Sequence, residues 1–230
     1  MQRTLLAAYG KSDHVGEESA IKGKPFTAPA DASTIDKVAA LIGANNIDVR
    51  VVDTGEDARR IVLGLIPEGA EVHSGKSKTL QDIGLFQDLF ESGRFNSVRA
   101  QYVNMDRQTQ SREIRKLSAA PDYMVGSLHA VTQSGDLVVT SASASQLGAY
   151  ASGAGRLILV VGSQKIVRDL DEVMERIEKV VFPYEDAMVR QTPGCRGAIP
   201  RPQRPPTRPP WPPAPPNRRC TPRPAACRCR

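Results

Sequence analysis

The sequence predicts an α/β domain with an open, mostly parallel sheet and flanking helices. Strand-like segments alternate with segments of helical period between residues 34 and 190, an order typical of parallel sheets. Polar, glycine-containing loops follow several of these strands. The 230 residues are ample for one domain with a buried core and short for two. We therefore expect a lead-in over 1–33, one domain over 34–190 and a Pro/Arg-rich tail over 191–230.

The first half of the domain alternates twice between helix and strand. Ser33 is a suitable N-cap for a helix that ends at the pair Asn45–Asn46. Alternating apolar residues then predict a strand over 47–53. The unit recurs, because residues 55–66 have helical period and residues 70–73 form the next strand after a Pro-Glu-Gly turn.

The second half continues the alternation around a more apolar strand. Residues 79–92 carry apolar side chains at helical spacing, and Gly93 follows as a helix stop. The segment LILVV at 157–161 is so apolar that we expect it in the middle of the sheet. The remaining elements are a helix over 107–117, strands over 122–126 and 137–140, and a last helix from the Asp169 cap to Glu178 or Val181.

The net charge is distributed unevenly along the chain. Residues 191–230 hold 13 of the 18 prolines, all four cysteines and nine arginines, and they contain no Asp, Glu or Lys. The tail therefore carries +9, although the whole chain carries only +6, and residues 1–190 have 22 basic against 25 acidic residues. A basic pI supports nucleic-acid binding only when the charge lies on a folded face. We expect no nucleic-acid partner.

Membrane and metal-site patterns are also missing from the sequence. No apolar run approaches the roughly 18 residues that cross a bilayer, and the N-terminus lacks the layout of a cleavable signal. We expect a cytoplasmic protein with no membrane span. Residues 1–190 contain no cysteine, and His14, His73 and His129 lack metal-site spacing. We therefore expect no metal ligands in this chain.

The loop over 74–78 (SGKSK) follows a predicted strand and precedes a helix. Its GKS segment does not form a phosphate-binding loop, because five residues separate Gly69 from Gly75 where that motif has four. Backbone N–H groups, Lys76 and Lys78 at a helix start would still suit an anion. The alternative is a capped helix start with solvated lysines, and the sequence leaves both open.

The loop over 126–135 (GSLHAVTQSG) also follows a strand. His129 is a candidate acid or base, because an imidazole exchanges protons near neutral pH. A lone histidine without a visible carboxylate partner is alternatively structural. A catalytic triad is not indicated, because Ser127 lies too close to His129 in sequence and no nucleophile-elbow pattern is present.

Two further polar loops follow the strands at 137–140 and 157–161. The first is TSASASQLG over 140–148, which is either a close approach for a ligand or a serine-capped helix start, and the second contains Lys165. Because parallel strands deliver their following loops to one edge of the sheet, we expect all four loops to line one pocket. The expected roles are anion binding by Lys78 and Lys165, hydrogen bonding by Thr132 and Gln146, and proton transfer by His129.

The stretches HSGKSKTLQDIGL, VGSLHAVTQSGDLVVTSASASQLGAY and ILVVGSQKIVRDLDEVMERIEKVVFPYEDA resemble the LUD-domain family, the lactate-utilisation proteins of bacteria. The resemblance runs from about Thr34 to Arg190. It implies a fold similar to the sugar-phosphate isomerase and CoA-transferase-like class. The family motifs fall on Gly75, Ser77, Thr79, Gly84, Gly126, His129, Thr132, Gly135, Ser141, Ser145, Gln146, Gly162, Lys165 and Ile166.

The resemblance implies a subunit that supports L-lactate oxidation to pyruvate with iron–sulfur partner proteins. The clusters would lie only in those partners, and the cysteine-free domain suits such a subunit. The expected ligand is a small anionic metabolite. A non-catalytic metabolite-binding or assembly module of the same fold is the alternative. The candidate site residues are His129 as the catalytic group, and Gly75, Ser77, Lys78, Thr79, Gly126, Thr132, Gly135, Ser145, Gln146 and Lys165 as substrate-binding groups.

The resemblance ends after PYEDA, where family members continue through a loop and further apolar strands. The 40 residues of the tail have no Leu, Val, Phe, Tyr or Ser, a composition like that of a GC-rich coding region read out of frame. The alternative is a real polyproline-type arm that binds a partner. We expect the tail to be disordered and the chain to be less stable than a full-length relative. The tail cysteines match no metal template: Cys195, Cys220, Cys227 and Cys229.

Overall fold

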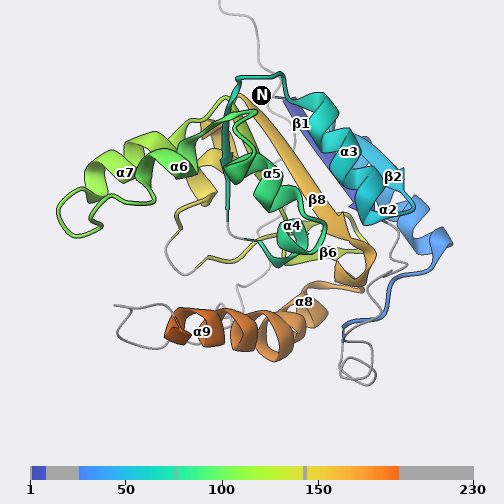
Figure 1. Ribbon diagram of the computed structural model, residues 1–230. Coiled ribbons are helices and arrows are strands. Elements are labelled where there is room, and N and C mark those ends of the chain that lie inside the picture. The colour runs from blue at the N-terminus through green and yellow to red at the C-terminus, as the bar shows by residue number, and fades with distance from the viewer. Residues whose placement is uncertain (1, 9–25, 76, 142–143, 192–230) are drawn as a thin grey trace, which may run out of the picture.

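The computed structural model describes residues 2–8, 26–75, 77–141 and 144–191. Its main sheet has six strands in the order β2-β1-β8-β5-β3-β4, and every neighbouring pair is parallel (Figure 1). This confirms the predicted α/β class. The strands are β1 (Gln2–Ala8), β2 (Asp48–Val52), β3 (Glu71–Ser74), β4 (Asn96–Ser97), β5 (Tyr123–Gly126) and β8 (Arg156–Gly162).

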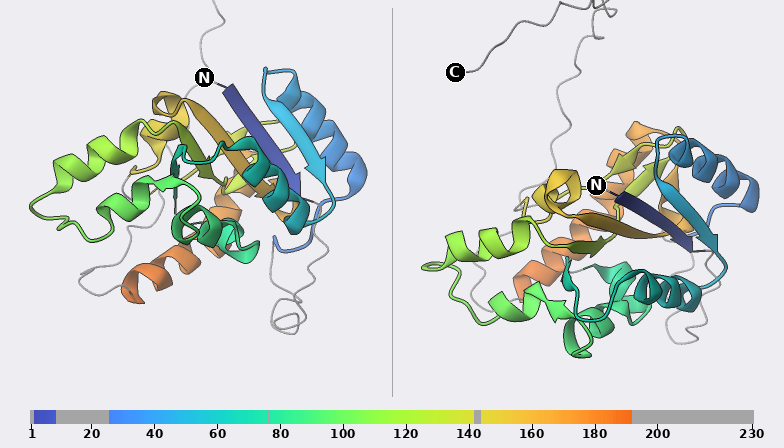
Figure 2. Two further views of the ribbon diagram at one scale, coloured as in Figure 1. Left: turned by 45° about the horizontal axis from the view of Figure 1, so that its top comes forward. Right: turned by 90° about the horizontal axis from the view of Figure 1, so that it is seen from above.

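The sheet is covered by helices on both faces (Figure 2). Helices α3 (Gly55–Leu65), α4 (Lys78–Asp82) and α5 (Leu85–Glu91) pack on one face, and α2 (Ala32–Gly43) packs on the other. Strand β8 serves both layers, because Ile158 and Val160 face α3 whereas Leu157, Leu159 and Val161 face α2. Its all-apolar sequence therefore marked the centre of the sheet correctly.

Strand β1 is an element that the sequence analysis did not predict, because residues 1–33 were expected only as a lead-in. β1 lies between β2 and β8, with Leu5 opposite Val49 on one side and Leu159 on the other. Its sequence QRTLLAA ends in a short apolar run, LLAA, without alternation. Such a run is typical of a strand in the middle of a parallel sheet, but periodicity alone does not distinguish it from other structures.

A second, three-stranded sheet has the order β7-β6-β9 and is built from β6 (Ala130–Thr132), β7 (Leu137–Val138) and β9 (Ile166–Val167). β6 pairs antiparallel with β7 and parallel with β9. The segment over 126–135, which we expected as one loop, therefore contains a strand. β6 ties the chain that follows β5 to the chain that follows β8.

Helices α2, α4 and α5 differ in detail from the prediction. The N-cap of α2 is Asp31, not Ser33, because the Asp31 carboxylate accepts hydrogen bonds from both the N–H and the hydroxyl of Thr34 at 2.9 and 2.8 Å. The single helix expected over 79–92 is divided into α4 and α5 at Gly84, whose φ of +72° a helix does not accept. Gly93 follows with a φ of +70°.

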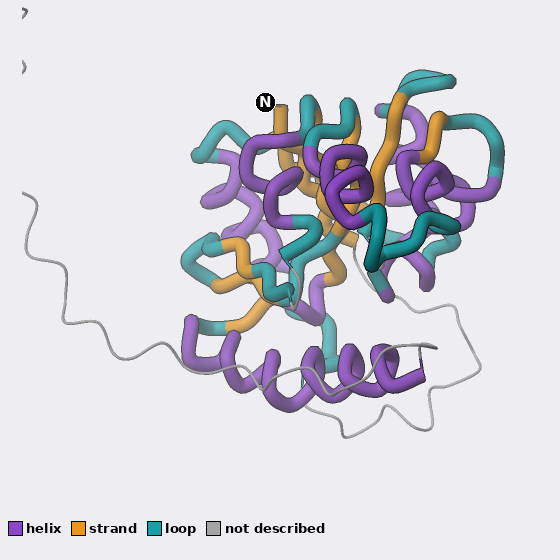
Figure 3. Tube along the Cα trace, turned by 90° about the vertical axis from the view of Figure 1, so that its left-hand side faces the viewer, coloured by secondary structure: helices purple, strands orange, loops and turns teal. Residues whose placement is uncertain are grey.

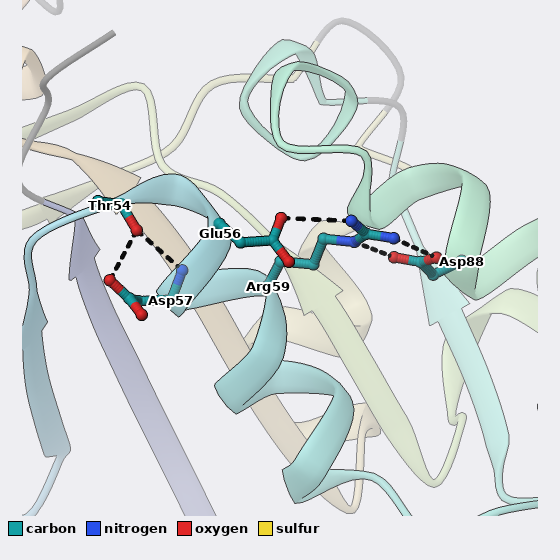
Figure 4. A network of polar contacts seen from close by, with 5 residues as sticks. All are labelled: Thr54, Glu56, Asp57, Arg59 and Asp88. Carbon is teal, nitrogen blue, oxygen red and sulfur yellow. Dashed lines mark hydrogen bonds and ion pairs between the residues drawn. The ribbon is translucent and has the colours of Figure 1, made fainter. Parts of the chain in front are cut away.

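Arg59 of α3 ties that helix to α5 (Figure 4). Its guanidinium donates two hydrogen bonds to the Asp88 carboxylate, at 2.6 and 3.0 Å, and a third to Glu56 at 3.3 Å. Thr54 caps the start of α3 by accepting from the N–H of Asp57 at 3.1 Å. These contacts fix α3 and α5 on one face of the sheet.

The C-terminal helical segment is longer than predicted and lies across the carboxyl end of the main sheet (Figures 1 and 3). It consists of α8 (Leu170–Arg176), a π-helical turn η3 (Ile177–Val181) and α9 (Phe182–Gln191). The wide π turn, in which the Phe182 N–H donates to the carbonyl of Ile177, comes directly before Pro183. A proline ring clashes with the preceding turn of a regular α-helix, and the wider turn accommodates it.

The remaining elements are short. They are α6 (Val98–Tyr102), α7 (Ser111–Ala119), a π-helical turn η1 (Ala149–Gly153) and a 3-10 turn η2 (Ser163–Lys165). The predicted disordered tail began at residue 191, but Gln191 is the last residue of α9, and the rest of that prediction, 192–230, lies outside the described residues. No helix in the described segments is long and apolar enough to cross a membrane.

Candidate functional site

A cleft of about 750 Å³ opens at the carboxyl edge of the main sheet. It is lined by chain segments that follow β3, β5 and β8, and by the helical segment η3–α9. Among its described lining residues, five are Lys or Arg and two are Asp or Glu. The cleft is therefore basic, although residues 1–190 as a whole are slightly acidic. These charged residues are Lys78, Arg99, Arg107, Lys165 and Arg176, with Asp82 and Glu185.

Lys165 joins the three loops that follow the parallel strands. Its Nζ donates to the hydroxyls of Thr79 at 2.7 Å and Ser127 at 2.8 Å, and to the carbonyl of Leu128 at 2.8 Å. Thr79 follows β3, Ser127 follows β5, and Lys165 ends the turn η2 after β8. The predicted convergence of these loops is therefore a direct contact between their side chains.

The pKa of Lys165 is lowered to about 7, mainly because the ammonium group loses hydration in the cleft. The positive charge of Arg176 lowers it further, whereas Asp82 raises it. All three hydrogen-bond acceptors of Nζ are neutral groups. Within the described segments, Lys165 forms no ion pair with a carboxylate.

Arg176 is a buried cation in the same cleft, with only 5% of its surface exposed. Its Nε donates to the carbonyl of His129 at 2.8 Å, and one terminal nitrogen donates to the carbonyl of Phe26 at 3.0 Å. In the part of the chain that the structure describes, it has no carboxylate partner. Buried charges are usually paired, so this guanidinium is a strong candidate for binding an anion.

The sequence analysis did not identify Arg176. The available signal was its position in α8, where it falls on the buried stripe formed by Val173 and Ile177. Arg176 follows Val173 by three positions and directly precedes Ile177. At helical spacing it therefore lies on the same inward face as these two buried residues.

The charges of Lys165 and Arg176 both act on His129. Its Nδ1 accepts from the N–H of Thr140 at 3.1 Å, which places the proton of the neutral ring on Nε2. Burial, followed by the charges of Lys165 and Arg176, lowers the pKa of His129 to about 4. At neutral pH this ring is uncharged and offers a hydrogen-bond donor.

A second histidine, His73, also lines the cleft and is only 4% exposed. Its ring contacts Tyr102 edge-on, with 5.7 Å between ring centroids, and its buried Nδ1 has no hydrogen-bond partner among the residues that the structure describes. Burial and the charge of Arg99 lower the pKa of His73 to about 4. The sequence analysis considered His73 only as a metal ligand.

The segment after β5 is held by Tyr150. The phenol oxygen donates to the carbonyl of Ser127 at 3.2 Å and accepts from the N–H of the same residue at 3.1 Å. A Cβ atom at position 126 would lie 1.7 Å from this oxygen, so the close approach requires Gly126. Burial raises the pKa of Tyr150 to about 12, and the phenol remains protonated. Gly126 therefore positions Ser127 by giving room to Tyr150.

The structure brings most of the predicted site residues to the cleft. Gln146 accepts hydrogen bonds there from the hydroxyls of Ser141 at 3.0 Å and Ser145 at 3.2 Å. Lys78 forms an ion pair with Asp82. Lys76 lies outside the described residues. The predicted residues that line the cleft are Gly75, Ser77, Lys78, Thr79, His129, Ser145, Gln146 and Lys165.

Like Gly126, the predicted residues Thr132 and Gly135 are not among the lining residues of the cleft. The hydroxyl of Thr132, which is fully buried, donates to the Asp136 carboxylate at 2.7 Å. Gly135 has a φ of +90° and lies against Leu41 of α2. Both residues build the turn between β6 and β7, on the α2 side of the sheet.

The comparisons with known proteins agree with the resemblance. A family model described as the LUD domain matches residues 35–208. The matched range continues past Arg190, where the sequence analysis ended the resemblance. The comparisons with curated proteins and with solved structures gave no match.

Proposed function

The chain belongs to the LUD domain family, which supports a role related to lactate utilisation, and from this premise we propose that its cleft binds a small carboxylate metabolite. We propose that the ligand is L-lactate or pyruvate, and that the chain supports lactate oxidation in the cytoplasm together with iron–sulfur partner proteins. The single observation that supports an anionic ligand is the pair of cations, Lys165 and Arg176, without carboxylate partners in the described chain.

A bound carboxylate would supply the missing negative charge. Taking a cation out of water is unfavourable unless a hydrogen-bonded counter-charge accompanies it. A guanidinium binds a carboxylate with directed N–H groups, and the hydroxyls of Thr79 and Ser127 are within hydrogen-bond distance of Lys165. His129 would donate from Nε2 to the oxygen on the second carbon of the ligand.

Oxidation of lactate to pyruvate also requires an electron acceptor. We assign the acceptor to iron–sulfur partners, and we assign to this chain the binding and orientation of the 2-hydroxy acid. The alternative is a metabolite-binding or assembly module without catalysis. The lowered pKa of His129 favours this alternative in one respect, because a base with a pKa of about 4 accepts little proton at neutral pH.

Titration calorimetry tests the proposal. We expect L-lactate and pyruvate to bind to the full chain, and lactamide, which lacks the carboxylate, not to bind. Lys165→Met should weaken binding of the acids about tenfold or more, since a hydrogen bond to a charged group contributes about 1.5–3 kcal/mol. The matched control is Lys37→Met, because Lys37 is exposed on α2 and does not line the cleft.

Equal binding of lactamide and lactate, or no binding of either acid, would contradict the proposal. A second measurement distinguishes a subunit that takes part in lactate oxidation from a binding module without catalysis. Lactate-dependent reduction of a dye by this chain mixed with its iron–sulfur partners, and its loss in Lys165→Met, would support the catalytic subunit. Binding without any effect of the chain on dye reduction would support the binding module.

A further inference from the structure

We propose that Lys165 forms a covalent imine with the carbonyl carbon of a 2-oxo acid bound in the cleft. The inference rests on the proposed function, since it uses the same cleft and the same carboxylate ligand. It adds a chemical step that carboxylate binding does not require. The substrate class it names is 2-oxo acids, of which pyruvate is the smallest.

The surroundings of Lys165 suit a nucleophilic amine. Its Nζ contacts two hydroxyl groups and one carbonyl, from Thr79, Ser127 and Leu128. None of these acceptors is charged, so loss of a proton from Nζ breaks no ion pair with them. Burial and the nearby Arg176 lower the pKa of Lys165 to about 7, so a large fraction of the lysine is a neutral amine at physiological pH.

Arg176 supplies the second requirement, which is a place for the carboxylate. Lys165 and Arg176 hydrogen-bond to the carbonyls of Leu128 and His129, which are consecutive in the chain. In a 2-oxo acid the carboxylate carbon is bonded directly to the carbonyl carbon. A carboxylate held by Arg176 therefore brings the electrophilic carbon toward the amine of Lys165.

The step is balanced without an oxidant or a reductant. The lone pair of Nζ forms a bond to the carbonyl carbon, and the carbonyl oxygen takes up a proton to give a carbinolamine. The carbon–oxygen bond then breaks, and the oxygen leaves as water with both hydrogens of the amine. The hydroxyls of Thr79 and Ser127, 2.7 and 2.8 Å from Nζ, are placed to pass these protons.

Lys78 is a matched comparison within the same cleft. It also lines the cleft, but it forms an ion pair with Asp82 and its side chain is 56% exposed. An ion pair with a carboxylate favours the charged ammonium form, which is not a nucleophile. The structure therefore predicts that Lys165 reacts and that Lys78 does not.

Reductive trapping tests the inference. The full chain is incubated with pyruvate and sodium cyanoborohydride at a pH of about 7.5, and the adduct is located by peptide mass spectrometry. We expect one adduct, on Lys165, that saturates with pyruvate and is at least about tenfold more abundant than any on Lys78, because Lys78 is held in an ion pair with Asp82 whereas Lys165 contacts only neutral acceptors. L-lactate has a hydroxyl in place of the keto group, so it should compete without forming an adduct.

Two variants make the assignment specific. Lys165→Arg keeps the positive charge but cannot form an imine, and it should lose the adduct. Lys37→Arg, at an exposed position of α2 outside the cleft, should keep it. If Lys165→Arg does not fold, the location of the adduct in the wild-type chain still decides the question. Labelling spread over exposed lysines such as Lys179, or retained in Lys165→Arg, would overturn the inference.

The outcomes separate this inference from the proposed function. Pyruvate that binds in calorimetry but gives no adduct overturns the imine and leaves the carboxylate site intact. A saturable adduct on Lys165 without binding of L-lactate supports the imine and overturns the assignment to lactate.

Discussion

Lys165 and Arg176 donate hydrogen bonds to consecutive carbonyl groups of one chain segment. Lys165 Nζ lies 2.8 Å from the oxygen of Leu128, and Arg176 Nε lies 2.8 Å from that of His129. The two cations come from different elements, the turn after β8 and helix α8. Because like charges at close range repel each other, an anion between them should stabilise the folded chain as well as bind to it.

Two histidines, the buried His73 and the half-buried His129, should make the stability of the chain depend on pH. Burial lowers the pKa of His73 and His129 to about 4, from an ordinary value of 6.5. Between these values the unfolded chain binds more protons than the folded chain, so the free energy of unfolding rises with pH from about 4 to 6.5. Each histidine should contribute on the order of 2–3 kcal/mol across this range. Urea denaturation at a series of pH values measures the slope, and His73→Gln and His129→Gln should each reduce it. An unchanged slope in both variants would show that the histidines are not buried in the neutral form.

Gly126→Ala should destabilise the chain strongly. The new Cβ would lie 1.7 Å from the phenol oxygen of Tyr150, so Tyr150 must move and lose both hydrogen bonds to Ser127. We expect the free energy of unfolding to fall by about 2 kcal/mol or more, measured by urea denaturation.

The matched control is Gly64→Ala in α3, where no atom lies within 4 Å of the new Cβ. Because alanine favours a helix over glycine, that variant should gain about 0.5–1 kcal/mol. Similar losses in both variants would argue against the contact.

The N-cap of α2 gives a prediction that distinguishes the structure from the sequence pattern. Asp31→Ala removes the acceptor for the N–H and hydroxyl of Thr34. It should lower the free energy of unfolding by about 1 kcal/mol. Ser33→Ala should have little effect, because Ser33 is the second residue of the helix and not its cap. If thermal melts show the reverse order, the cap is misassigned.

The contact between Arg59 and Asp88 should contribute more to the free energy of unfolding than a typical surface ion pair does. Two hydrogen bonds join the groups, and Arg59 and Asp88 side chains are 34% and 22% exposed. A double-mutant cycle with Arg59→Ala and Asp88→Ala should give a coupling of about 1 kcal/mol. The same cycle on Arg60 and Asp57 is the control, since Arg60 is 75% exposed. Its coupling should be near zero, and a larger value there would contradict the role of burial.

Local patterns predicted much of the fold, and the missing parts have identifiable causes. LILVV in β8 was recognised because a strand covered on both faces needs an unbroken apolar run. β1 was not recognised, because its short run QRTLLAA has no periodicity and its pairing partners are distant in sequence. The division between α4 and α5 was hidden by an apolar stripe that continues across Gly84.

The sequence predicted the site only where the strand topology determines which loops come together. The loops after β3, β5 and β8 were expected together because parallel strands end at one edge, and Thr79, Ser127 and Lys165 do meet there. Arg176 was missed, because a charge in an amphipathic helix normally indicates the solvated face. Thr132 was expected in the pocket, but it is the last residue of β6 and its hydroxyl hydrogen-bonds to Asp136 in the turn that follows.

The position of β1 has a consequence for the order in which the chain folds. β1 joins β2 and β8, and Leu5 lies opposite Leu159, so the pairing spans nearly the whole domain. During synthesis β1 emerges before the other strands of the sheet, and its second partner becomes available only after residue 162 has emerged. Until then one side of β1 has unpaired backbone groups that are open to other chains. Since long-range strand pairing slows folding, insertion of β1 between β2 and β8 should be the slow step of refolding, and it is the step at which aggregation competes.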